Sequence, residues 1–142
     1  MTDALKTVLH LRRLTLDDAK RCLATLLNAE DEAQHEVDVA ENALAAEGAV
    51  AADPSMGDHV VEAYVAWLPV GRAQVVRARA GVHRVQMEIS RARAALTLAH
   101  AALEAAEGLA MRRAHEKTLR AQLRAQSVED ELAAQITTIK TG

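Results

Sequence analysis

Apolar residues recur along most of this chain at alternating intervals of three and four. The spacing is clearest from Val61 to Ala110, where it lasts seven heptads with arginines and other polar residues between the apolar positions. A spacing kept for so long predicts the seam of a coiled coil, since the apolar face of an ordinary globular helix is shorter. The seam positions are Val61, Tyr64, Leu68, Gly71, Val75, Ala78, Val82, Val85, Ile89, Ala92, Leu96, Ala99, Leu103, Ala106 and Ala110.

An earlier stretch, from about residue 3 to 47, repeats the pattern and predicts a first helix on the order of 65 Å long. Thr2 or Asp3 can cap its first turn by accepting backbone N–H groups. Only Arg12 and Glu30 break the apolar spacing. The other positions are Leu5, Leu9, Leu16, Ala19, Leu23, Leu26, Ala33, Val37, Ala40 and Leu44.

Residues 48–58 (GAVAADPSMGD) contain two glycines and a proline, a composition typical of a connector between helices. Gly48 stands where the C-terminal glycine of the first helix is expected. Ser55 or Asp58 is expected to cap the second helix.

The second helix is expected from about residue 58 to 139, with an interruption near residue 69. Pro69 removes a backbone hydrogen bond and clashes with the preceding turn. The sequence allows either a kink within one helix or a short helix ending at Trp67, followed at once by a long one. After Ala110 the apolar spacing slips, which predicts a looser seam.

Charge indicates how the helices pair. No lysine or arginine lies between Cys22 and Gly71, whereas residues 30–47 hold seven acidic side chains and residues 72–93 hold six arginines. Complementary flanking charges select partner and orientation in coiled coils, so an antiparallel hairpin within one chain is predicted. Facing residue numbers are expected to sum to about 105, which places Leu5 near His100 and leaves a C-terminal helical overhang of about 40 residues.

The overhang and the connector end of the hairpin are the candidate interaction surfaces. Tyr64 and Trp67, the only aromatic residues, lie near that end with Leu68. Aromatic residues are enriched in interface hot spots, but local packing explains this pair equally well. The overhang begins with the cations Arg112, Arg113, Lys117, Arg120 and Arg124, and continues with Glu129, Asp130 and Glu131.

The chain shows no pattern typical of an enzyme or of a cofactor site. Cys22 is the single cysteine, no two of the six histidines are three or four residues apart, and one Glu32-x-x-His35 unit is too little for a di-iron bundle. The net charge of −3 and the absence of stacking aromatics among the arginines argue against nucleic-acid binding. There is neither a signal peptide pattern nor an apolar run long enough to insert in a membrane.

Four segments together resemble the flagellar export proteins of the FliJ family and their type III secretion counterparts, the YscO family. They are the opening ALKTVLHLRRLTLDDAKRCLATLL, the connector ADPSMGD, the start of the second helix VVEAYVAWLPVGRAQ, and the charged tail MRRAHEKTLRAQLRAQSVEDEL. Pro69 departs from the uninterrupted second helix of that family.

The resemblance implies an all-α, cytoplasmic, two-helix antiparallel coiled coil that acts as the stalk of a protein export apparatus. Such a stalk binds a hexameric export ATPase, reaches the cytoplasmic domain of the membrane export gate, and handles export chaperones. By analogy the ATPase would contact Arg112, Arg113, Lys117, Arg120 and Arg124, and the gate Tyr64, Trp67 and Leu68. The sequence leaves open whether a flagellar or a virulence-type system is served.

A homodimeric coiled-coil scaffold or adaptor is the alternative interpretation of the same pattern. In it two hairpins pack as a four-helix bundle whose overhangs bury each other. This alternative predicts a stable dimer, whereas the stalk interpretation predicts a monomeric hairpin of marginal stability.

Overall fold

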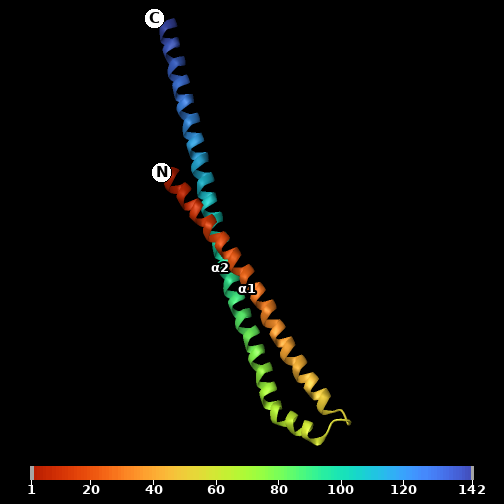
Figure 1. Cartoon of the computed structure of the whole chain (residues 1–142). Helices are drawn as coiled ribbons and strands as arrows, with labels where there is room; N and C mark the ends of the chain where they lie inside the picture. The colour runs from red at the N-terminus through yellow and green to blue at the C-terminus, as the bar shows by residue number, and fades with distance from the viewer. Residues whose placement is uncertain (1, 142) are drawn as a thin grey trace. The chain divides into compact units, whose positions relative to one another are not determined.

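The computed structural model of the chain describes residues 2–141, and these form two long helices with no strand. Helix α1 spans Thr2–Ala51 and helix α2 spans Asp58–Thr141 (Figure 1). The all-helical prediction and the pairing of two long helices are therefore confirmed. The chain divides into two compact units, one formed by residues 16–98 and the other by residues 1–15 with 99–142.

The residues most shielded from solvent lie at positions of the predicted seams. No described side chain is completely buried, so the core is a single row of side chains between two helices. Among the predicted positions of α2, only Val61 is exposed. Arg12, which breaks the seam of α1, is exposed as well. The buried hydrophobic residues are Leu16, Val37, Val75, Ile89, Ala92, Ala99 and Ala106.

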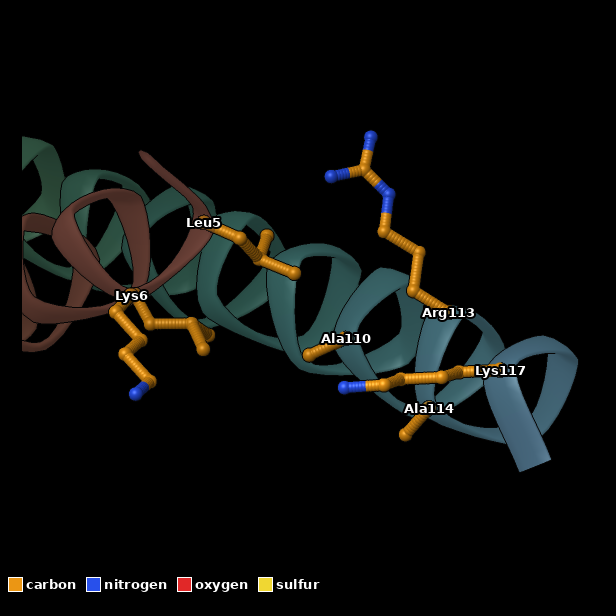
Figure 2. A pocket seen from close by; sticks show the side chains of 7 residues that line it. Leu5, Lys6, Ala110, Arg113, Ala114 and Lys117 are labelled. Carbon is orange, nitrogen blue, oxygen red and sulfur yellow. The ribbon is translucent and has the colours of Figure 1, made fainter. Parts of the chain in front are cut away.

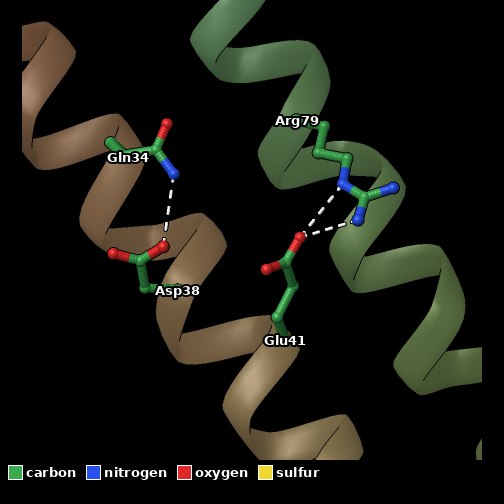
Figure 3. A network of polar contacts seen from close by, with 4 residues as sticks. All are labelled: Gln34, Asp38, Glu41 and Arg79. Carbon is green, nitrogen blue, oxygen red and sulfur yellow. Dashed lines mark hydrogen bonds and ion pairs between the residues drawn. The ribbon is translucent and has the colours of Figure 1, made fainter.

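In the unit formed by residues 16–98, the helices pair through oppositely charged side chains beside the seam. Arg79 donates through Nε and Nη2 to Glu41 Oε1, at 3.2 and 2.7 Å (Figure 3). On α1 the Gln34 amide donates to Asp38 at 3.2 Å. Arg84 borders a groove with acidic residues of α1. The acidic and basic blocks therefore face each other at least in part, as the sequence predicts.

The register of this pairing differs from the prediction. The facing residues Glu41 and Arg79 have numbers that sum to 120, against about 105 expected. Near the connector, Tyr64 lies against Gly48, whose numbers sum to 112. The first turns of α2 therefore do not pair residue for residue with the end of α1. Each later residue of α2 consequently faces a residue of α1 with a higher number than predicted.

The first helix continues beyond Gly48, which is not its C-terminal cap. No described residue, glycines included, has the positive φ that such a cap requires. The Gly48 carbonyl instead accepts a bond from the Ala52 amide at 3.0 Å. The helix ends at Ala51, shortly before Asp53, because a residue that precedes proline avoids the helical region.

Ser55 does not cap the second helix, because the helix begins three residues later, at Asp58, and Ser55 is instead bonded to Asp53. The Ser55 amide and hydroxyl donate to Asp53 Oδ1 at 2.9 and 2.8 Å. These bonds, the backbone one first, stabilise the carboxylate and lower the pKa of Asp53 below its ordinary value. Asp58 is the first residue of α2 itself, where its negative charge favours the helix N-terminus.

Helix α2 is continuous through Pro69, so the alternative of two separate helices is wrong. Proline is tolerated inside a helix when the chain bends away from the lost hydrogen bond. A kink at Pro69 is the interpretation that remains.

In the unit that contains residues 3–15 and 99–141, the start of α1 packs beside α2. Leu5 and Leu9 share a groove with Ala110 and Ala114. Leu5 therefore does not face His100, because the register shift moves its partners toward the C-terminus. Fewer residues than the 40 expected extend past α1, although every described residue from Met111 to Thr141 is exposed.

Candidate protein-interaction surfaces

The first surface is a groove between the start of α1 and the middle of α2. Its volume is about 540 Å³, and Leu5, Leu9, Ala110 and Ala114 give it an apolar floor. Cationic side chains form its border (Figure 2): Lys117 extends back along α2 toward Ala110, while Arg113 extends in another direction. An apolar floor with cationic edges suits an apolar segment that carries acidic residues. The third cation of the border is Lys6.

A row of four cations runs along α2 from this groove toward the C-terminus. Arg113, Lys117, Arg120 and Arg124 are spaced by four, three and four residues, so they lie on one face of the helix. All four are exposed. We call these residues the basic row. Arg112, also predicted as a contact, lies about 100° around the helix and does not belong to it.

An apolar face lies beside the basic row. It continues the seam of α2 toward the C-terminus, past the N-terminal turns of α1. Its first part consists of the small residues Ala114, Ala121 and Ala125. The second part is bulky, and its side chains are between 53 and 77 % exposed. Exposed apolar stripes of this length are typical of contact surfaces for other helices. The bulky residues are Val128, Leu132, Ile136 and Ile139.

The second candidate surface is the aromatic end of the unit formed by residues 16–98. The Tyr64 and Trp67 rings are 6.4 Å apart between centroids and tilted by 35°. A Cβ at Gly48 would lie 3.3 Å from the Tyr64 hydroxyl, and one at Gly71 would lie 2.5 Å from the Trp67 ring. Both rings are thus packed against a glycine. Leu68, like the two aromatic residues, is only half-buried, so part of the cluster faces solvent.

This packing predicts opposite responses from two helical glycines. Gly108→Ala should raise the free energy of unfolding by about 0.5–1 kcal/mol, because nothing lies within 4 Å of the new Cβ and alanine favours the helix. Gly71→Ala should lose that gain because the Trp67 ring must move. Urea unfolding checks stability, and the emission of Trp67, the single tryptophan, should shift to the red in Gly71→Ala alone. Equal stabilisation with unchanged emission would contradict the packing of Trp67 on Gly71.

The side chains that could bind a metal ion are dispersed over the described residues. They contain no group of three or more histidine, cysteine, aspartate or glutamate side chains placed to hold a metal ion. Cys22 is exposed and forms no disulfide. Over their described residues, neither α1 nor α2 has a stretch with the length and apolar character needed to cross a bilayer.

Comparison with protein-family models, with curated proteins and with solved structures finds no match to this chain. The structure therefore defines only a class, that of all-helical proteins with two long helices packed against each other.

Proposed function

We propose that this chain is a non-enzymatic stalk component of a flagellar or type III protein export apparatus. Its place would be cytoplasmic, at the inner face of the membrane, between a hexameric export ATPase and the cytoplasmic domain of the export gate. The observation that carries the proposal is the basic row, which offers four cations on one face of an exposed helical segment. The resemblance of the sequence to the FliJ and YscO families supplies the identity of the partners.

The ATPase contact is assigned to the basic row and Arg112, on the C-terminal overhang of the hairpin. A long helix can enter the opening of a ring, and cations on it bind acidic side chains of the ring subunits. Charge complementarity of this kind accelerates association and fixes orientation. The groove at Leu5 and Leu9 lies beside the row and offers the same partner an apolar contact.

The gate contact is assigned to Tyr64, Trp67 and Leu68. These side chains are half-buried, so each keeps surface for a partner. Packing against Gly48 and Gly71 holds the Tyr64 and Trp67 rings in place. Large, pre-ordered aromatic residues lose little entropy on binding. A kink at Pro69 would direct this cluster away from the axis of the hairpin. Export chaperones are a further class of partner for a stalk of this type.

The test is to mix the purified chain with the hexameric export ATPase of the same cell. ATP hydrolysis and ring assembly are measured against the concentration of the chain. We expect a saturable rise that levels off at about one chain per six ATPase subunits, because one stalk fills one ring. A chain with Ile89→Asp, which disrupts the seam, serves as the unfolded control.

No rise at concentrations where the ATPase is active alone would refute the stalk. The homodimeric scaffold would then be the better account of the fold.

A further inference from the structure

We infer that the exposed segment of α2, residues 111–141, binds the same segment of a second copy of this chain in antiparallel orientation. Three features of the segment are self-complementary: the sizes of its apolar residues, the position of its groove, and the order of its charges. The pairing follows from these features alone and does not depend on the proposed export role.

The apolar face is small toward one end and bulky toward the other. In an antiparallel pair with a seam spaced by three and four, facing positions have a constant sum of residue numbers. With a sum of about 253, Ala125 faces Val128 of the second copy and Ala121 faces its Leu132. Ile139 likewise faces Ala114, so three of the four bulky residues lie opposite an alanine, where the helices can approach closely. The fourth, Ile136, falls opposite Lys117.

The same register fills the groove near α1. Ile139 of the second copy falls opposite Ala114, beside the apolar floor that Leu5 and Leu9 form. Ile139 is 77 % exposed in the single chain, so the pair buries the most exposed apolar side chain of this face. A parallel pair would instead place alanines opposite alanines and leave the groove without an occupant.

The charges along the segment also complement themselves when it is reversed. Lysine and arginine dominate residues 112–124, and three acidic residues follow at 129–131. In the register above, Arg124 lies beside Glu131 of the second copy, both next to the seam. Two-fold symmetry repeats the contact, so each dimer has two such ion pairs.

Self-pairing covers Lys117 and Arg124, two members of the basic row. If the proposed function is correct, the monomer is the form that binds the ATPase, the dimer and the ATPase complex exclude each other, and the dimer is a resting form. That consequence rests on the proposed function, whereas the pairing is measured on this protein alone.

The experiment compares two single variants, Arg124→Glu and Glu131→Arg, by sedimentation equilibrium of the full chain. Each variant places like charges at both symmetric contacts of its own dimer, so we expect the dimer dissociation constant to rise on the order of tenfold. An equimolar mixture of the two variants should regain the affinity of the natural chain. In the mixed dimer one contact joins the two substituted side chains and the other joins the two natural ones, and both contacts again pair opposite charges.

Arg112→Glu is the matched control, because Arg112 lies away from this face, and it should leave the constant unchanged. Far-UV circular dichroism shows whether each variant keeps its helices. Three results would overturn the inference: a natural chain that stays monomeric at all concentrations, single variants that dimerise as tightly as the natural chain, or a mixture that is not rescued. The last would indicate a parallel pair, in which Arg124 and Glu131 do not meet.

Discussion

Replacing Ile89 by alanine will lower the free energy of unfolding by about 2–3 kcal/mol. Ile89 is only 4 % exposed, the lowest value among the buried hydrophobic residues. The core is one side chain thick, so no second layer can close over the space that the isoleucine leaves. The loss should appear as a lower urea midpoint in far-UV circular dichroism, with little change in the slope of the transition.

Leu98→Ala is the matched control for this loss. Leu98 lies on the same helix and in the same unit, but its side chain is 71 % exposed. Leucine and alanine have similar helix propensity, so the change should alter stability by less than about 0.5 kcal/mol. If both variants lost the same stability, helix propensity alone would hold the fold, and the seam would not be its core.

The seam itself could be predicted from the sequence because it depends on local spacing. Ile89, Ala92 and Ala99 are buried where the intervals of three and four place them.

The continuity of α2 through Pro69 could not be predicted from the sequence, which left a kink and two separate helices as alternatives. Proline weakens one turn, but the burial of Gly71 and Val75 on the next turns outweighs that local cost.

The register could not be predicted from the same spacing. A seam of alanine, leucine and valine fits its partner nearly as well when shifted by one or two heptads. The connector decides between these alternatives, and its path depends on tertiary contacts such as Tyr64 against Gly48. The Leu5 groove was missed for the same reason, because it is placed by the register.

The residues of the basic row were predicted from the sequence, but their alignment on one face of the helix was not. These residues were identified as cations of an overhang, yet the spacing of four, three and four that aligns them also excludes Arg112 from the row. That spacing needs no structure to be seen. The nearness of Lys117 to the start of α1, by contrast, follows only from the observed register.

Reversing Lys117 and Arg120 to glutamate should weaken binding of the proposed export ATPase on the order of 100-fold. Each substitution removes one favourable contact and adds a like charge against an acidic partner, and each such change is worth about tenfold. The measurement is a titration of the labelled chain with the assembled ATPase at low and at high salt. The defect should shrink as salt rises, because ions screen exposed charges.

Arg91→Glu with Arg93→Glu makes the same change in net charge on the other unit of the chain and is the control for it. Both arginines are exposed and lie outside the basic row. If the control pair weakened binding as much as the Lys117 and Arg120 pair, net charge would govern the association and the basic row would not be its site. Self-pairing would cover Lys117, so the titration uses the labelled chain well below its dimer dissociation constant. A loss of ATPase binding under that condition cannot be caused by a change in self-pairing.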